Sequence, residues 1–295
     1  MKSPLSYAIR ILFAGALIAL ALPRAAGAHA GAEEELREVD ARLAASPKDA
    51  QLVLRRGELN RIRGDFAAAR ADYARARRLD PDLAAVDLCL GTMLLEQRRP
   101  KEALRALDRF LAREPDHAEG LAARARARLA LRDPTGAAAD FTRVIDRAGP
   151  GDPARPDLYL DRARALASQG KSRLDEALRG LDEGIGRLGD PVALELLAID
   201  LEIRRHRTDA ALARLDRIQA RSPRKEAWLA RRGEILERAG RKDEARIAHA
   251  QALAALHTLP PARRATRATA RLEDEITAAL ARLGAPIPGR EARSR

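Results

Sequence analysis

The stretch that decides the fold is residues 50–83, which read AQLVLRRGELNRIRGDFAAARADYARARRLDPDL. Its middle, Gly64-Asp65-Phe66, is a turn signal between two segments rich in alanine, leucine and arginine. Alanine favours helices because it loses no side-chain entropy when a helix forms. Pro81 closes the stretch, since proline cannot continue a helix and restricts the residue before it. The stretch therefore predicts a helix, a turn and a second helix.

The same pattern recurs along the chain at intervals of 34 residues, with one interval of 40 in the middle. A small residue lets two antiparallel helices approach closely, and a larger residue four positions later fills the gap against the neighbouring helix. The small residues are Ala69, Ala103, Ala137, Ala177, Ala211 and Ala245. The larger residues are Tyr73, Leu107, Phe141, Leu181, Leu215 and His249. Such self-similarity is typical of repeat architectures.

The 34-residue pattern resembles the tetratricopeptide repeat (TPR) family, and the resemblance covers roughly residues 50–259. It implies an all-α fold, a right-handed superhelical solenoid of about six helix-turn-helix units with N- and C-terminal capping helices. Each unit is a helix pair that cannot bury its apolar face alone, so stacking the units buries a continuous core. We expect the units at residues 50–83, 84–117, 118–151, 156–191, 192–225 and 226–259.

The ends of the chain lie outside this array. We expect an N-terminal capping helix within residues 31–48, at Glu33–Ala45, and a C-terminal capping helix within residues 260–283. Residues 284–295 carry prolines and glycines and are expected to form a disordered tail. The Gly149-Pro150-Gly151-Asp152-Pro153 segment reads as a loop and is a candidate hinge.

The first thirty residues have the layout of a secretory signal peptide. Lys2 and Arg10 precede an apolar run from Ile11 to Leu22, and Ala28-His29-Ala30 offers a cleavage site after Ala28 or Ala30. The run is shorter than the ~20 apolar residues that a spanning helix needs. We therefore expect a periplasmic or secreted protein with no transmembrane segment in its mature chain. The alternative is an uncleaved membrane anchor.

Composition sets further limits. The formal net charge is +12, which permits binding to polyanions without establishing it. The one cysteine, Cys89, cannot form a disulfide within the chain, so packing must stabilise the fold. Aromatic residues make up only 3% of the chain, and stacking aromatics are what a single-stranded nucleic-acid groove uses.

The sequence offers no convincing catalytic, cofactor or metal site. Gly184, Gly186 and Gly189 match G-x-G-x-x-G, but a helical stretch precedes them where a dinucleotide site needs a strand. We interpret them as a frayed helix end and the loop between two repeats. No two histidines stand at metal-ligand spacing. Cys89 has no nearby histidine signature and is interpreted as a spare thiol. We expect no catalysis and no cofactor.

The TPR resemblance implies that partners bind in a concave groove lined by the first helix of each repeat. The charged positions that it places there nearly balance. The basic ones are Arg55, Arg61, Arg126, Arg164, Arg204, Arg231 and Arg238. The acidic ones are Glu58, Glu96, Glu119, Asp157, Asp161, Asp200, Glu234 and Glu237. A balanced groove with few aromatics argues against nucleic acid as a partner. The candidate partner-binding residues are Leu54, Arg55, Glu58, Leu88, Thr92, Arg126, Arg164, Leu196, Asp200, Arg231 and Glu234.

These features predict a non-enzymatic scaffold or adaptor of the cell envelope that binds a partner's peptide or helix in the groove. An alternative is a protein that attaches to anionic lipid or wall polymer through Arg263, Arg264, Arg267 and Arg271. An enzyme would need a site built across repeats, which no residue spacing suggests.

Overall fold

A computed structural model describes residues 23–149, 155–189 and 191–284 of the chain. These residues form helices and turns, with no strand among them. The molecule divides into two compact units, Met1–Arg98 and Arg99–Arg295. The division falls in the turn between α4 and α5 inside the second repeat, whereas the sequence suggests residues 149–156 as a candidate hinge. Residues 150–154 lie outside the described part of the chain.

The first unit contains the helices α1 (Pro23–Ala45), α2 (Ala50–Ile62), α3 (Phe66–Leu79) and α4 (Ala85–Glu96). Val39 of α1, Val53 of α2, Tyr73 of α3 and Met93 of α4 are all buried in one apolar cluster. Each helix therefore contributes one face to a shared core, as stacked helix pairs require.

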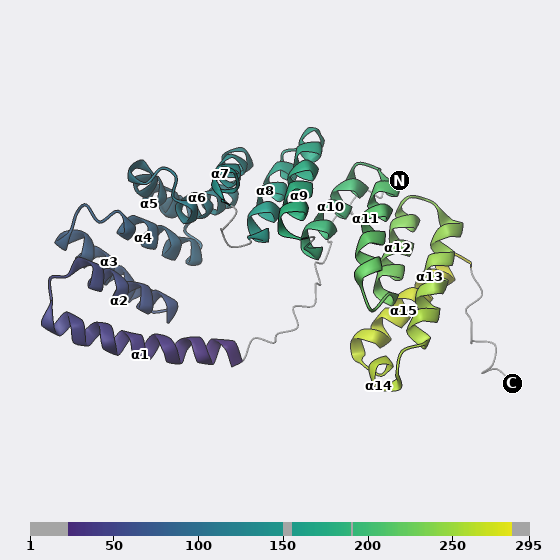
Figure 1. Ribbon diagram of the computed structural model, residues 1–295, viewed down its shortest axis with the longest axis horizontal. Coiled ribbons are helices and arrows are strands. Elements are labelled where there is room, and N and C mark those ends of the chain that lie inside the picture. The colour runs from purple at the N-terminus through teal and green to yellow at the C-terminus, as the bar shows by residue number, and fades with distance from the viewer. Residues whose placement is uncertain (1–22, 150–154, 190, 285–295) are drawn as a thin grey trace, which may run out of the picture. The chain divides into compact units, whose positions relative to one another are not determined.

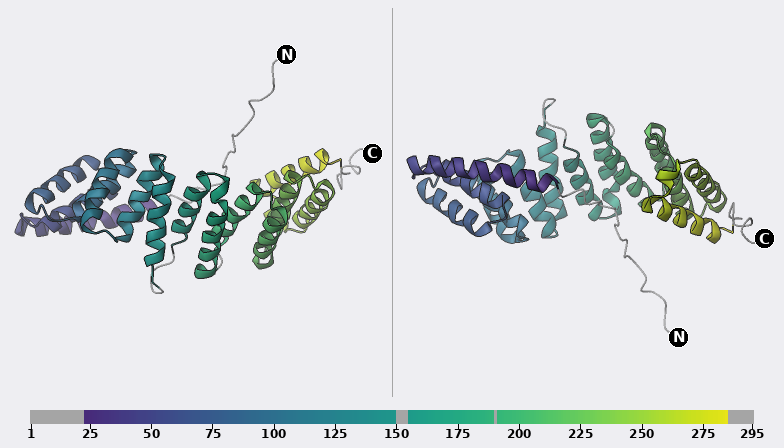
Figure 2. Two further views of the ribbon diagram at one scale, coloured as in Figure 1. Left: turned by 90° about the horizontal axis from the view of Figure 1, so that it is seen from above. Right: turned by 90° about the horizontal axis from the view of Figure 1, so that it is seen from below.

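The second unit continues the alternation of first and second helices (Figures 1 and 2). Successive helices from α5 to α13 pack against one another, and α15 packs on α13. Ile276 and Leu280 of α15 are buried in a cluster with Ala252, Leu253 and Leu256 of α13, so α15 closes the end of this core. The helices are α5 (Pro100–Arg113), α6 (Ala118–Ala130), α7 (Pro134–Arg147), α8 (Pro156–Ser168), the short 3₁₀ helix η1 (Lys171–Arg173), α9 (Leu174–Leu188), α10 (Val192–Arg204), α11 (Thr208–Arg221), α12 (Glu226–Arg238), α13 (Lys242–His257), α14 (Pro261–Arg264) and α15 (Arg267–Arg282).

The two ends differ in detail from the sequence-based expectation. Helix α1 begins at Pro23, ten residues before the expected start at Glu33, because the intervening segment is rich in alanine. The expected C-terminal helix is broken into α14 and α15, because the Thr266 hydroxyl accepts the Thr269 backbone N–H and starts a new helix. Most of the predicted signal peptide (residues 1–22) and most of the predicted disordered tail (residues 285–295) lie outside the described residues.

A residue with positive φ marks the turn between the two helices of every repeat. Glycine occupies this position in three repeats, at Gly64, Gly170 and Gly240. Side-chain-bearing residues occupy it in the others, where Arg98 has φ 57°, Arg132 has φ 62° and His206 has φ 61°. The left-handed conformation brings Cβ close to the following carbonyl oxygen, which costs roughly 1–2 kcal/mol for an L-residue. Three of the six turns are therefore strained.

Replacing Arg132 by glycine is expected to stabilise the turn between α6 and α7 by about 0.5–1 kcal/mol, because glycine relieves the strain but loses more chain entropy on folding. Hydrogen exchange of the amides of α6 and α7 measures this local stability. The reverse substitution, Gly240→Arg, should weaken α12 and α13 by a similar amount. If both variants were as stable as the wild type, the left-handed conformation of Arg132 would not be strained.

Buried arginine–aspartate pairs fix the register of the helices in two repeats. Arg124 of α6 donates to Asp140 of α7 at 3.0 and 2.8 Å, and to Asp108 of α5 at 3.2 Å. Asp140 is only 4% exposed, so these bonds compensate a carboxylate removed from water. Arg56 of the first unit makes the same bidentate contact with Asp72, at 3.0 and 2.6 Å.

Candidate functional site

The first helices of the repeats carry all the residues that the TPR resemblance assigns to partner binding. We call the exposed side of these helices the first-helix face. It is formed by α2 and α4 in the first unit and by α6, α8, α10 and α12 in the second unit.

In the second unit, polar contacts link each first helix to the next across this face. Arg126 of α6 donates to Asp157 of α8 at 3.0 Å. Arg204 of α10 donates to the Ala167 carbonyl of α8 at 2.9 Å, and Arg231 of α12 donates to Asp200 of α10 at 2.8 Å. The charges therefore bind one another and hold adjacent repeats together.

The remaining charged candidates of this unit join the same ion-pair network. Arg164 pairs with Asp161 one turn earlier at 3.3 Å, and Glu234 pairs with Arg231 at 2.8 Å. Ion pairs between exposed side chains contribute only about 0–1 kcal/mol each, so a partner's charged group can replace one of them at little cost.

In the first unit, the charged candidates are part of the helix packing. Arg55 pairs with Glu35 of α1, and Arg61 pairs with Glu96 of α4. Glu58 accepts a 3.0 Å bond from Arg61 and a short one from the Tyr73 hydroxyl. Burial acts to raise the pKa of Glu58, but the bonds from Arg61 and Tyr73 outweigh it and hold that pKa below its ordinary value. Burial, together with the same carboxylate, raises the pKa of the Cys89 thiol to about 12.

Glu58 should make the first unit sensitive to acid. Its pKa is lowered on folding, so the stability that it contributes is complete above its ordinary pKa of 4.5 and is lost as the pH falls through the folded-state value. Replacing Glu58 by glutamine should lower the local stability of α2–α4 by about 1–2 kcal/mol at pH 7. The difference between variant and wild type should shrink at low pH. Hydrogen exchange of α2 and α3 measures this difference in stability between variant and wild type. If the difference did not change with pH, it would contradict this role of Glu58.

The apolar candidates differ in how much surface they offer. Leu196 of α10 is 36% exposed, and Val192, one turn earlier on the same helix, is 43% exposed. Leu88 is half-buried, as is Thr92, whose hydroxyl donates to the Leu88 carbonyl. Leu54 is buried in the core of the first unit and offers little surface to a partner. Ile62, at the end of α2, is 45% exposed but stands alone, so the strip with two adjacent exposed apolar side chains lies on α10.

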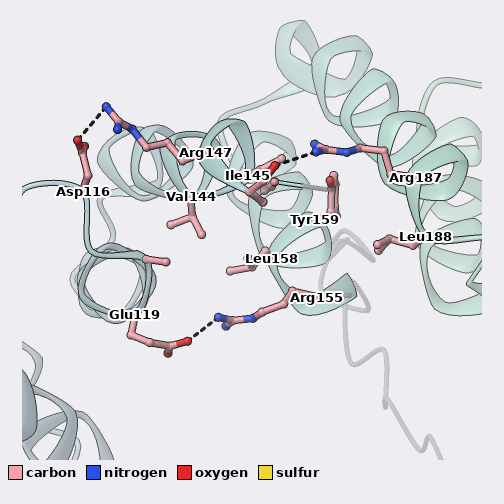
Figure 3. Close-up of a pocket in the computed structure, with 13 residues that line it drawn as sticks. Asp116, Glu119, Val144, Ile145, Arg147, Arg155, Leu158, Tyr159, Arg187 and Leu188 are labelled. Atoms are coloured by element: carbon pink, nitrogen blue, oxygen red, sulfur yellow. Dashed lines mark hydrogen bonds and ion pairs between the residues drawn. The ribbon is translucent and has the colours of Figure 1, made fainter. Parts of the chain in front are cut away.

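A second feature, which the sequence did not reveal, is a pocket of about 770 Å³ between the third and fourth repeats (Figure 3). Its walls come from the N-terminal ends of α6 and α8 and the C-terminal ends of α7 and α9. Val144, Ile145, Leu158 and Tyr159 are buried residues that form an apolar floor. Three arginines and two carboxylates surround this floor: Arg147, Arg155, Arg187, Asp116 and Glu119.

The break in the repeat period was the available signal for this pocket. The connection from α7 to α8, between Arg147 and Pro156, is the longest between consecutive repeats, and it coincides with the 40-residue interval. The lining residues themselves follow the general repeat pattern, so nothing in the sequence distinguishes them from ordinary packing positions.

The other sequence candidates have structural roles. Gly184 and Gly186 lie within α9 and Gly189 is its left-handed cap, so interpreting all three as a frayed end and loop was wrong for the first two. A Cβ at Gly184 would lie 2.7 Å from the Tyr159 ring, which explains a glycine there. His249 is buried and its Nε2 lies 2.7 Å from Glu237.

The described part of the chain contains no group of three or more His, Cys, Asp or Glu residues placed to hold a metal ion. None of its helices combines the length and the apolar character needed to span a bilayer.

The repeat pattern matches a known family model. The model for the tetratricopeptide repeat matches residues 90–153, 122–185 and 196–262, which together make up more than half of the chain. The chain belongs to the tetratricopeptide repeat family. No curated protein matches the chain in sequence.

Solved TPR structures share the fold. A tetratricopeptide repeat protein from Parabacteroides merdae is 18% identical, with a TM-score of 0.51 over 85% of this chain and 93% of that one. YrrB, described as a TPR protein with an unusual peptide-binding site, is 18% identical, with a TM-score of 0.53 over 65% of this chain and 95% of that one. PilW, described as a type IV pilus biogenesis factor, is 18% identical, with a TM-score of 0.52 over 68% of this chain and 94% of that one. Identities this low establish a shared all-α TPR solenoid and nothing about shared partners.

Proposed function

We propose that this TPR protein is a non-enzymatic scaffold of the cell envelope that binds a peptide or helix of a partner protein on its first-helix face. Membership of the TPR family supports protein interaction as the general function. The observation that carries the choice of face is the exposed apolar strip of Val192 and Leu196, bordered by charged side chains that pair with one another.

The α10 strip can anchor a partner through apolar contact. Burying Val192 and Leu196 under a partner removes apolar surface from water, which contributes about 25 cal/mol per Å². Asp200 and Arg231 flank the strip and can exchange their mutual ion pair for contacts with the partner, which fixes its register. Affinity then comes from the leucine and valine, and specificity from the flanking charges.

The envelope location rests on the sequence of the first thirty residues. Lys2 and Arg10, the apolar run to Leu22 and the small residues at Ala28 and Ala30 support export through a cleaved signal peptide. N-terminal sequencing of the protein recovered from the cell envelope tests this. A mature start at His29 or Gly31 is expected, and recovery of the intact chain in the cytoplasm would contradict export.

Cross-linking capture from cell-envelope extract, followed by mass spectrometry at low and high salt, tests the scaffold. We expect a small set of proteins that persists at high salt and is lost when Leu88 and Leu196 are both replaced by aspartate. The matched control is Ile247→Asp, which changes a 56% exposed apolar residue on the second helix α13. If the double variant captured the same proteins as the Ile247→Asp control, the first-helix face would not be the surface that binds the partner.

A second candidate function is attachment to an anionic envelope surface through the C-terminal helices. Arg263, Arg264 and Arg267 are exposed, and Arg271 pairs only with the neighbouring Glu275 in the contacts described, at 2.9 Å. Electrostatic attachment weakens as ionic strength rises. Co-sedimentation with vesicles containing phosphatidylglycerol should then disappear at high salt and in a variant with all four arginines changed to glutamine. Sedimentation that resists both changes would contradict this candidate.

A further inference from the structure

We infer that the pocket between the third and fourth repeats is a second recognition site, which binds an acidic segment of a partner protein with an apolar side chain inserted over Val144 and Leu158. The pocket lies at the ends of α6–α9, and its lining includes none of the exposed apolar residues of α10. It shares Glu119 and the N-terminal ends of α6 and α8 with the first-helix face but not the α10 strip, so a substitution at Leu196 distinguishes the two sites.

The size and floor of the pocket suit an apolar anchor. A volume of about 770 Å³ lies within the ~300–1,000 Å³ that is typical of ligand pockets. Val144 and Leu158 form the middle of its floor with only 5% and 3% of their surface exposed, so a ligand contacts them from above, and Leu188 lies beside them (Figure 3). An apolar side chain seated there is removed from water on most of its surface.

The arrangement of charge identifies the rest of the ligand. Arg147 ends α7, Arg155 precedes α8 and Arg187 lies in α9, and their guanidinium groups lie on different sides of the opening (Figure 3). One carboxylate, such as the head of a fatty acid, can contact only one or two groups spread in this way. A peptide with carboxylates on both sides of an apolar residue can reach several. The spacing therefore favours an acidic peptide over a small amphiphile.

The ion pairs at the rim can be exchanged at little cost. Arg147 pairs with Asp116 at 2.8 Å, and Arg155 pairs with Glu119 at 2.7 Å. Asp116 also pairs with Arg143, so it keeps a cation if a ligand takes Arg147. The Glu119 carboxylate side chain is 63% exposed and returns to water if it is displaced. Arg187 donates to the Ala148 carbonyl at 3.2 Å and pairs with Glu183 at 3.3 Å, and the Tyr159 side chain also interacts with it.

Fluorescence anisotropy of the full chain with a labelled peptide of alternating glutamate and leucine tests the inference. The double variant Arg155→Gln/Arg187→Gln should raise the Kd about tenfold, which corresponds to the loss of about 1.4 kcal/mol. Ala118→Trp, at an exposed lining position, should abolish binding by filling the pocket while leaving every charge in place. The double variant Arg179→Gln/Arg246→Gln removes equal charge from exposed positions outside the pocket and should leave the Kd unchanged.

Three results would overturn the inference. One is a peptide of alternating lysine and leucine that binds as tightly, since it would show that charge does not select the ligand. Another is an equal loss of affinity in the Arg179→Gln/Arg246→Gln control, since it would assign binding to net charge. The last is laurate that displaces the peptide at the peptide's own Kd, since it would identify a lipid-like ligand. Leu196→Asp should not change binding of this peptide, which separates the result from that of the first-helix face.

Discussion

Replacing Arg214 by methionine is expected to lower the free energy of unfolding of α9–α11 by about 3 kcal/mol. Arg214 of α11 is buried with two carboxylates of α10, Glu195 at 1% and Glu202 at 6% exposure. It contacts Glu195 at 3.3 Å and Glu202 at 3.6 Å. Burial acts to lower the pKa of Arg214, but its bonds to Asp182 and Glu195 raise it, so the group stays charged.

The cost arises because the two carboxylates remain when the arginine is removed. Glu195 keeps Arg217 at 3.0 Å, but Glu202 loses its ion-pair partner, and its Oε2 already has no hydrogen-bond partner. A buried charge without a partner is strongly destabilising, whereas a buried pair replaced by apolar residues is often neutral. Methionine keeps much of the arginine's volume, so the effect reports charge and not a cavity.

Hydrogen exchange at the amides of α9–α11 measures this effect region by region, which suits a repeat protein that need not unfold in one step. The control is Glu202→Leu, alone and combined with Arg214→Met. The combined variant should recover part of the stability lost by Arg214→Met, because no uncompensated carboxylate remains at position 202. If the combined variant were no more stable than Arg214→Met alone, the uncompensated Glu202 carboxylate would not be the cause of the lost stability.

Replacing Gly57 by valine is expected to destabilise the α2–α3 pair by about 1–3 kcal/mol through overpacking. A Cβ at position 57 would lie 2.6 Å from Tyr73 Cε1 and 2.8 Å from Cδ1. The tyrosine ring is 2% exposed and its hydroxyl is bonded to Glu58, so it cannot move away easily. The close approach of the two helices therefore requires a residue without a side chain at this position.

Gly186→Val is the matched control, because Gly186 also lies within a helix and has no atom within 4 Å of an added Cβ. Its effect on stability should stay within about 0.5 kcal/mol. In a double-mutant cycle, Tyr73→Ala should remove part of the cost of Gly57→Val, since the clash involves that ring. Strict additivity of the two changes would show that the helices do not meet through this contact.

The repeat register could be predicted because it depends on local rules. Ala69, Ala103 and Ala137 are fully buried, as their spacing predicted, because a small residue is needed wherever two helices approach. The six turns recur in phase for the same reason. The left-handed Arg98, Arg132 and His206 could not be foreseen, since only tertiary packing holds a side-chain-bearing residue in that conformation.

The interaction sites could be predicted only in outline. The family pattern placed Leu196, Asp200 and Arg231 on the first helices of their repeats, and α10 and α12 carry them. It did not show that these charges pair across adjacent repeats, because the pairs join residues about 30 positions apart in sequence. The cluster of Arg214 with Glu195 and Glu202, and the pocket over Val144 and Leu158, both arise between helices and have no local sequence signature.

The most direct test of the proposed function is site-specific photo-cross-linking in the living cell with benzoylphenylalanine at Leu196. The matched position is Ile247, which is more exposed at 56% but lies on a second helix, α13. The proposal predicts discrete cross-linked protein bands from position 196 that are absent from position 247 and are lost with Asp200→Arg in the same chain. Equal cross-linking from both positions, or none from position 196, would contradict partner binding on the first-helix face.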